Sequence, residues 1–267
     1  MKKLEIQILV ATMFQDDYSL LDKLNVQSDV VVVNQCNREG INLFEYNGYN
    51  VLWIDSTERG LSRSRNMALQ NASADICVLC DDDERLSDGY PSMIKEAYSA
   101  LPKADFIAFN IIRIGSPITE KTFTKPKRIG RFKPYGSVHI TFKRKRVVEN
   151  GIRFDVRFGA GSGVYSCGED SIFCMECHKS GLKMYTHPGF ICEVTCEKST
   201  WFKGYNEKYF YDVGAYLVAA FPKLKSVLKW YYPIRCRRLS ELKMSEIISA
   251  INSGMRSFKS SQKEEDK

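Results

Sequence analysis

A run of four acidic residues ends a short apolar segment: Ile76–Cys80 leads directly into Asp81–Glu84. A buried strand that ends in carboxylates concentrates negative charge at the carboxyl edge of a sheet, where open α/β sheets bind their ligands. Carboxylates this close repel one another unless a cation lies among them, and oxygen ligands favour a hard divalent ion such as Mg²⁺ or Mn²⁺. Such ions commonly hold the phosphates of a nucleotide. The alternative is a solvated acidic turn.

A second motif, the segment Gly60–Asn66 (Gly-Leu-Ser-Arg-Ser-Arg-Asn), opens a predicted helix just before the acidic strand. A glycine and a serine at a helix start leave backbone N–H groups free for a phosphate or a base. Arg63 and Arg65 differ by two positions and therefore point in different directions on a helix. One of them can reach a ligand while the other pairs with an acid. The alternative is a capped amphipathic helix whose arginines are solvated.

The third motif is rich in glycine: Gly159–Gly163 (Gly-Ala-Gly-Ser-Gly) precedes Gly168-Glu169-Asp170. Glycines let a backbone approach a ligand closely and also serve as hinges of mobile lids. Glu169 and Asp170 lie at the start of a predicted helix, where the helix dipole favours the ionised carboxylate. Such a carboxylate can act as general base for a hydroxyl nucleophile. An acidic helix cap without a catalytic role is the alternative.

Histidine and cysteine supply further metal-ligand types. His187 follows a predicted strand over 182–186 and precedes a turn at Pro188-Gly189, so it is a metal ligand, a phosphate contact or a surface histidine. The nine cysteines, several of them inside apolar segments, indicate reduced thiols packed in a core. Three cysteine pairs have spacings that also occur in metal sites: 77 and 80, 174 and 177, 192 and 196. None of them shows the regular residue pattern of a zinc knuckle.

The elements that must position these residues alternate along the first half of the chain. Strands alternating with helices predict a parallel, doubly wound sheet with helices on its faces. The predicted strands are 4–11, 30–33, 51–54, 76–80 and 106–112, and the predicted helices are 18–24, 61–70 and 91–101. The second half is mixed: strands and loops over 113–150, a helix over 171–180, a strand over 182–186, and basic, aromatic helices after about residue 212 with a frayed end at 259–267.

Composition places the chain among ordinary globular proteins. Of its 267 residues 44% are hydrophobic and 27% charged, and no apolar run approaches the roughly 18 residues that span a bilayer. The net charge of +7 gathers in basic runs at 125–133, 143–146 and 223–238. A basic periphery around an acidic site suits an anionic substrate or an anionic membrane surface, and on charge alone nucleic acid also fits. We expect a cytoplasmic protein without a secretion signal.

The three motifs, in this order and spacing, resemble the family 2 glycosyltransferases of the GT-A type over roughly residues 4–190. The resemblance implies an α/β fold with a Rossmann-like, mostly parallel sheet flanked by helices and a C-terminal helical extension. It implies inverting, metal-dependent transfer from a nucleotide-sugar donor to a saccharide or lipid-linked acceptor, of the kind found in bacterial surface polysaccharide synthesis. Residues 1–215 would form the transferase domain (donor half 1–112, acceptor half 113–215), and 216–267 a basic helical extension.

The resemblance also implies roles for single residues. Asp83, with His187 as a further candidate ligand, would hold Mn²⁺ or Mg²⁺ against the diphosphate, where the ion acts as a Lewis acid. Asp170 would remove the proton of the acceptor hydroxyl, with Glu169 beside it holding the acceptor. The residues expected to bind the nucleotide sugar are Thr12, Asn34, Arg63, Asn66, Asp81 and Asp82.

Two positions depart from the family pattern. Asn34 stands where the family commonly has an acid that reads the nucleotide base, although its carbonyl can accept a hydrogen bond from a uracil N3–H. The first strand ends Ala11-Thr12-Met13, without the proline-tyrosine often found there. UDP as the nucleotide is therefore an expectation from the family alone.

Alternatives remain for function and location. A nucleotidyltransferase would share the sheet and the acids, but residues 12–15 contain none of its usual glycines. A nucleic-acid-binding protein suits the charge but gives no reason for four acids after a buried strand, so we expect no nucleic-acid partner. Residues 223–238 are typical of a helix lying on anionic lipid, and equally of an ordinary helix with a basic outer face. The first would place the protein peripherally on the inner face of the cell membrane.

Overall fold

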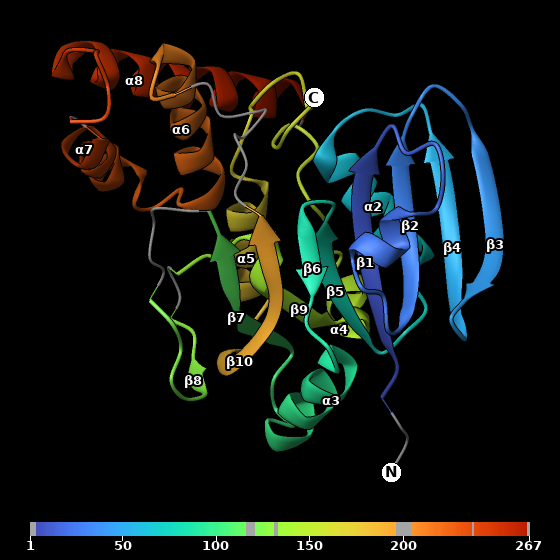
Figure 1. The fold of residues 1–267 in the computed structure, drawn as a ribbon. Coiled ribbons are helices and arrows are strands. Elements are labelled where there is room, and N and C mark those ends of the chain that lie inside the picture. The colour runs from blue at the N-terminus through green and yellow to red at the C-terminus, as the bar shows by residue number, and fades with distance from the viewer. Residues whose placement is uncertain (1–3, 116–120, 131–132, 196–203, 237, 266–267) are drawn as a thin grey trace.

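A single sheet with helices on both faces organises the chain (Figure 1). The computed structural model describes residues 4–115, 121–130, 133–195, 204–236 and 238–265. In these residues the sheet has ten strands: nine follow the order β3-β4-β2-β1-β5-β9-β7-β10-β6, and the tenth, β8, pairs with β10. The strands are β1 (Ile6–Met13), β2 (Asp29–Gln35), β3 (Gly40–Tyr46), β4 (Tyr49–Ser56), β5 (Ile76–Asp81), β6 (Glu84–Leu86), β7 (Phe106–Ile114), β8 (Lys127–Arg128), β9 (Ile140–Lys143) and β10 (Met184–Thr195).

The central strands run in one direction. β1 is parallel to β2 and β5, and β2 is parallel to β4. β9 is antiparallel to both β5 and β7, and β7 is parallel to β10, so β7 and β10 point the same way as β5. The carboxyl ends of these strands therefore meet at one edge of the sheet, where open α/β sheets place their sites. The predicted mostly parallel sheet flanked by helices is confirmed.

Helices cover both faces because the central strands are apolar on both sides. Alternate residues of β1 face opposite layers: Ile8 and Val10 pack with the helices on one face, and Leu9 packs with those on the other. The first layer holds α1 (Leu20–Lys23) and α3 (Tyr90–Ala100). The second holds α2 (Leu61–Asn71), α4 (Arg144–Glu149) and α5 (Glu169–Lys179), and the 3₁₀ turn η1 (Ser137–His139) precedes β9.

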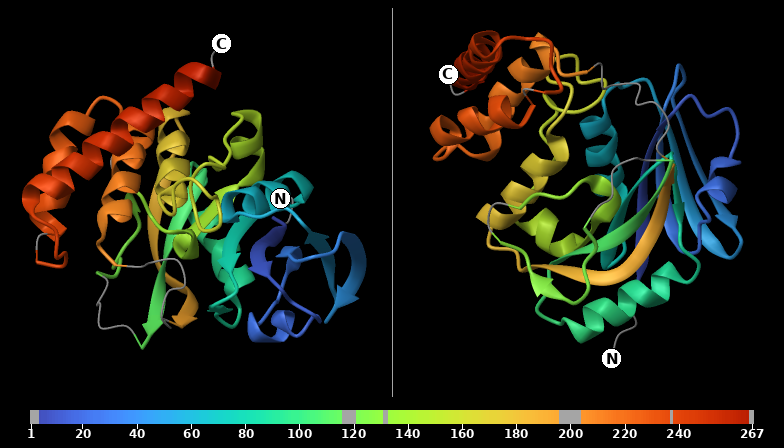
Figure 2. Two further views of the ribbon diagram at one scale, coloured as in Figure 1. Left: turned by 90° about the horizontal axis from the view of Figure 1, so that it is seen from above. Right: turned by 60° about the vertical axis from the view of Figure 1, so that its left-hand side comes forward.

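The C-terminal helices form a third core against α5. They are α6 (Glu207–Ala220), α7 (Lys225–Cys236) and α8 (Met244–Glu265), and they lie on the side of the molecule away from β3 and β4 (Figures 1 and 2). Phe158 and Tyr165, from the segment before α5, are buried in this core. α6 runs without a break through residue 215, where the sequence predicted a domain boundary. The predicted frayed end is wrong, because α8 continues to Glu265.

Two strands escaped prediction. β3 is the antiparallel edge strand, and its pairing with β4 is set by a two-residue turn at Asn47-Gly48. Both turn residues have positive φ, 50° and 81°, as the tight turn of a hairpin requires. The Asn-Gly pair was a readable signal for this hairpin. β6 is only three residues long and depends on its antiparallel partner β10.

The buried cysteines match the expected thiol packing. The eight cysteines within the described ranges are free, and seven of them are buried. Cys196 lies outside the described residues. Among the helices that the structure describes, none combines the length and hydropathy required to cross a bilayer.

The crossing of α6 and α8 depends on two glycines, and we predict that Gly254→Ala destabilises the protein. A Cβ at Gly254 would collide with the carbonyl oxygen of Tyr211, and one at Gly214 with that of Ile251. Helix propensity alone would favour alanine by about 1 kcal/mol, whereas overpacking against rigid backbone costs about 1–3 kcal/mol or more. We expect the Tm to fall by roughly 2–8 °C. The matched control is Gly130→Ala, where a Cβ meets open space; an equal Tm for both variants would contradict the close crossing.

Candidate active site

One buried arginine gathers three carboxylates at the carboxyl edge of the sheet. Arg65 projects from α2 and its side chain is only 2% exposed. Its Nη2 donates to both oxygens of Asp81, at 2.8 and 2.9 Å. Its Nη1 donates to Asp170 Oδ1 at 2.5 Å and contacts Glu169 Oε1 at 3.3 Å. The end of β5 and the first turn of α5 are therefore joined through one guanidinium, whose planar fork suits such pairing.

Ser137, from η1, completes the link between the two acidic elements. Its hydroxyl donates to Asp81 Oδ2 at 3.0 Å, and its backbone N–H donates to Asp170 Oδ2 at 3.1 Å. The ring of Phe154 lies 5.5 Å from the Arg65 guanidinium carbon, which is within cation–π range. Serine and phenylalanine in these loops carry no sequence motif, and sequence reasoning missed both.

Burial and mutual repulsion make the α5 carboxylates weak acids. Burial, followed by the charge of Asp170, raises the pKa of Glu169 to about 7, although Arg65 acts in the opposite direction. Burial also raises the pKa of Asp170. For Arg65, burial alone would lower the pKa, but the three carboxylates together raise it and keep the guanidinium charged. Three acids share one permanent cation, so the cluster retains an excess of negative charge.

The side chains of the acidic run Asp81–Glu84 lie in different surroundings. Asp82 accepts a hydrogen bond from the Thr12 hydroxyl at 2.7 Å, and its carbonyl accepts from the Lys23 ammonium. Glu84 turns inward: it is 2% exposed, its Oε1 accepts from the N–H of Asp81, and its Oε2 is buried beside Cys192. Burial, with the nearby charge of Asp81, raises the pKa of Glu84 well above its usual value. Glu84 thus supports the acidic turn from beneath.

The residues present fit a cation that is shared with a phosphate ligand. Burial and the charges of Asp81 and Asp82 raise the pKa of Asp83, so a cation beside it would relieve a real repulsion. In the part of the chain that the structure describes, no three His, Cys, Asp or Glu side chains form a ready-made metal cage. Mg²⁺ is usually bound by one or two carboxylates together with substrate phosphates, and Asp82 and Asp83 can supply such carboxylates.

His187 does not belong to this group. β10 continues through His187, contrary to the predicted strand end at Thr186, and the ring lies against Phe109 of β7. Its Nδ1 accepts from the N–H of Gly189, and burial lowers its pKa. The strand contacts Asp83 at Thr195, and between His187 and Thr195 it runs beside Phe109–Ile114 of β7, a span of roughly 16 Å. The prediction of His187 as a partner of Asp83 in a metal site is wrong.

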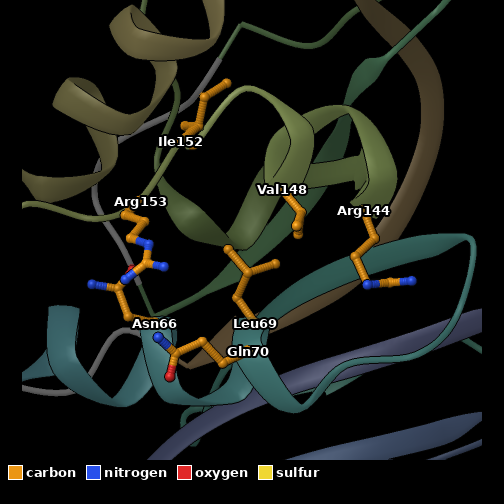
Figure 3. Close-up of a pocket in the computed structure, with 8 residues that line it drawn as sticks. Asn66, Leu69, Gln70, Arg144, Val148, Ile152 and Arg153 are labelled. Carbon is orange, nitrogen blue, oxygen red and sulfur yellow. The ribbon is translucent and has the colours of Figure 1, made fainter.

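Two residues of the second motif also lie elsewhere. Arg63 donates to the carbonyl of Arg59, and the contact with the acids belongs to Arg65, on the other side of α2. Asn66 uses both its amide oxygen and its amide nitrogen on the backbone of Phe154. It lines a cavity of about 200 Å³ between α2 and α4 (Figure 3), which none of the acids lines. Its carboxamide is therefore engaged by this segment and lies away from the acidic cluster.

The N-terminus of α2 is closed by the glycine-rich loop. Gly60 N–H donates to the Gln35 side chain, Leu61 N–H donates to the carbonyl of Ala160, and the Ser62 hydroxyl donates to Phe158. The expectation that these N–H groups are free for a ligand is wrong for Gly60 and Leu61. A Cβ at Gly159 would lie 3.2 Å from the Glu169 side chain, so glycine there permits the close approach of this loop to the site.

A further acid lies at the end of β4. Asp55 is 5% exposed and accepts from Asn34 at 2.7 Å, from Trp53 at 3.1 Å and from Arg38 at 2.6 Å. Burial alone would raise its pKa, but these donors hold it below the usual value. Asn34 is fully buried and also binds the backbone of Gln15, so it positions Asp55 and presents no free face to a ligand. Asp55 follows an apolar strand as Asp81 does, and that signal was present in the sequence.

Comparison with known proteins assigns the chain to a family. The sequence profile described as Glycosyl transferase family 2 matches residues 19–163, more than half of the chain. The chain belongs to glycosyl transferase family 2. It is accordingly a glycosyltransferase, which decides against the nucleotidyltransferase and nucleic-acid-binding alternatives. A search of curated protein sequences found no match.

Solved structures of TarS from S. aureus share the fold of this family 2 member. TarS 1–349 with UDP superposes with a TM-score of 0.60 at 14% identity, covering 91% of this chain and 77% of TarS. TarS 1–349 with UDP-GlcNAc gives 0.59 at 12% identity, covering 97% and 92%. TarS 1–349 alone gives 0.57 at 15% identity, covering 96% and 72%. The GT-A type fold expected from the motifs is confirmed.

The arginine cluster generates a stability prediction. Arg65→Met would leave three carboxylates, one buried and two partly buried, without their cation, and breaking a buried charge pair in this way costs about 3–5 kcal/mol. Arg65→Lys retains the charge but loses the fork, so we expect an intermediate loss. Urea unfolding measures both. Arg63→Met on the same helix is the control and should change the free energy of unfolding by less than about 1 kcal/mol; equal losses at both positions would contradict the cluster.

The raised pKa of Glu169 predicts how stability depends on pH. With a pKa of about 7 when folded and about 4.5 when unfolded, Glu169 binds more protons in the folded state between these values. The free energy of unfolding should therefore fall as pH rises from about 4.5 to about 7. We expect a smaller fall for Glu169→Gln, measured by thermal unfolding at pH 5, 6, 7 and 8. Glu176→Gln, an exposed position on α5, should keep the wild-type dependence. Parallel curves for all three proteins would refute the assignment.

Proposed function

We propose that this glycosyltransferase moves a sugar from a UDP-activated donor to an acceptor hydroxyl, with inversion at the anomeric carbon. The observation that carries the proposal is the Arg65 cluster, which brings Asp81 at the end of β5 within one side chain of Asp170 at the start of α5. A donor site and a base for the acceptor must lie this close for direct displacement. TarS, which shares the fold, was solved with UDP and with UDP-GlcNAc, and this supports the choice of nucleotide.

The donor would lie at the ends of β1, β4 and β5. Asp81 and Asp82 would face the nucleotide, with Thr12 holding Asp82 in place. A Mn²⁺ or Mg²⁺ ion held by Asp83 would supply Lewis-acid stabilisation of the diphosphate leaving group. Phe14, at the end of β1, is 56% exposed and carries the Arg59 guanidinium over its ring at 5.4 Å. We assign this aromatic face to the uracil base.

The acceptor would approach from the α5 side. Asp170 is the proposed general base, because burial raises its pKa and so strengthens it as a proton acceptor. Its two oxygens bind Arg65 and Ser137, and each carboxylate oxygen retains a second lone pair for the acceptor hydroxyl. Glu169 would orient the acceptor. We propose a saccharide or lipid-linked acceptor in bacterial surface polysaccharide synthesis, with the donor half at 1–112 and the acceptor half at 113–215.

Measurements of ligand binding, hydrolysis and sugar transfer test this function. Mn²⁺ with UDP should raise the Tm by several degrees, and slow metal-stimulated hydrolysis should identify the donor from a panel of nucleotide sugars, since water needs no acceptor site. Asp170→Asn should keep the UDP-dependent Tm shift and lose transfer by about 10²–10⁴-fold. Asp83→Asn should weaken Mn²⁺ binding, read directly by electron paramagnetic resonance. Asp88→Asn, at the exposed start of α3, is the control.

The outcomes separate the parts of the proposal. Absence of any Tm shift with every nucleotide diphosphate, with and without metal, would overturn the donor site. Normal turnover in Asp170→Asn would remove that residue as the base while leaving the donor site intact. Unchanged Mn²⁺ affinity in Asp83→Asn would remove that residue as a metal ligand.

A further inference from the structure

The segment around α7 is basic and contains no acidic residue. Between Val213 and Ser240 the sequence contains no Asp or Glu. The cations in the same stretch are Lys223, Lys225, Lys229, Arg235, Arg237 and Arg238. This contrasts with the acidic edge of the sheet, so the molecule presents opposite charges at two places. The basic stretch includes α7, which lies on the outer side of the α6–α8 group (Figure 1).

α7 presents apolar side chains to solvent as well as to the core. On its inner side Leu224, Leu228 and Tyr232 pack against the third core. Its outer side exposes Val227 (71%), Trp230 (50%), Tyr231 (48%) and Ile234 (71%). Spacings of three and four residues place these four on one stripe of the helix, and Leu239 follows it, 60% exposed. We call these five residues the α7 outer face.

Cations flank the aromatic residues of this face. The Lys229 ammonium lies 5.4 Å from the Trp230 ring. The Arg235 guanidinium lies 5.8 Å from the Tyr231 ring and donates to its hydroxyl at 2.6 Å. Lys223 and Arg238 are exposed at the two ends of the segment. Aliphatic side chains in the centre, aromatic rings beside them and cations at the margin form the composition of helices that lie in a membrane interface.

We propose that the α7 outer face docks on the surface of an anionic lipid bilayer. The aliphatic residues would enter the headgroup boundary, and the cations would meet lipid phosphates. A second copy of this face would bring like charges together, which disfavours symmetric self-association. Single-stranded nucleic acid would use stacked rings and cations but gives no role to Val227, Ile234 and Leu239.

Docking would place the acceptor side of the site near the membrane. α6 packs against α7 on one side and against α5 on the other. Asp212 of α6 is fully buried and accepts from both the N–H and the hydroxyl of Ser166, two residues before Gly168. The turn that carries Glu169 and Asp170 is therefore attached to the docking helices. The inference deepens the proposed function, on which it rests, by favouring an acceptor that is presented at the bilayer.

Vesicle flotation of the full chain tests the docking. Wild type should bind vesicles of phosphatidylglycerol and phosphatidylcholine at least about tenfold more strongly than pure phosphatidylcholine, because each cation near an anionic surface contributes roughly fivefold. Trp230→Ser with Ile234→Ser should reduce binding about tenfold or more. Ile41→Ser with Leu43→Ser is the matched control, since these residues are 72% and 76% exposed on the edge strand β3. Lys229→Glu with Arg235→Glu should abolish the preference for anionic lipid.

Each result either supports or overturns the docking. Equal binding of wild type and the Trp230/Ile234 variant would overturn it, as would equal binding to both lipid compositions. A wild-type dimer in sedimentation without vesicles that the Trp230/Ile234 variant no longer forms would assign the face to a second copy of the chain. Tighter binding of the wild type to single-stranded DNA than to vesicles would assign it to nucleic acid. Nucleotide-sugar hydrolysis without vesicles should be unchanged in this variant, so failure of docking and failure of the sugar-transfer proposal are separately visible.

Discussion

The site depends on the ion pairs that Arg65 forms with Asp81, Glu169 and Asp170. Its guanidinium is buried, and burial of a charge is tolerated only where opposite charges and hydrogen bonds surround it. Here the partners come from two elements that are distant along the chain. Asp81 lies 16 residues after Arg65, and Asp170 lies 105 residues after it. The arginine is 2% exposed, whereas the side chains of Asp81 and Asp170 are 26% and 21% exposed, so the fully buried charge is the one that these carboxylates neutralise. The end of β5 and the start of α5 are therefore held together, and Asp81 and Asp170 bind the same guanidinium.

The packing around this cluster is layered. The glycine-rich loop closes the N-terminus of α2, which carries Arg65, through the contact of Leu61 with Ala160. The same loop continues into Tyr165, which is buried against the C-terminal helices, and Ser166, which Asp212 holds. The helices after residue 204 therefore support the turn that carries Glu169 and Asp170. Two glycines bring the backbones of α6 and α8 into close contact.

The charge distribution fits a transferase that works between an anionic donor and a surface. Acids concentrate at the sheet edge, where a divalent cation can be shared with a diphosphate. Cations concentrate on α7, with exposed aromatic and aliphatic side chains among them. The net charge of +7 therefore conceals an acidic sheet edge and a basic segment around α7, which have opposite signs. Membership of glycosyl transferase family 2 shows that the chain is a glycosyltransferase, and the proposals above give roles to the acidic edge and to the basic helix.

Local sequence pattern was sufficient for the central strands, the helices that carry motifs, and the acids that follow β5. Apolar runs with β-branched residues indicate buried strands, and a residue directly after such a run lies at the sheet edge wherever the strand pairs. Pattern could not choose between Arg63 and Arg65, because both lie on one helix and only packing decides which side of α2 faces the acids. Sequence pattern could not place His187, because the bulged course of β10 depends on its partner β7. It also could not predict the contact of Asn34 with Asp55, because that contact depends on the pairing of β2 with β4. The positions of these side chains are determined by contacts between segments that are distant in sequence. Those contacts form only when the sheet has assembled.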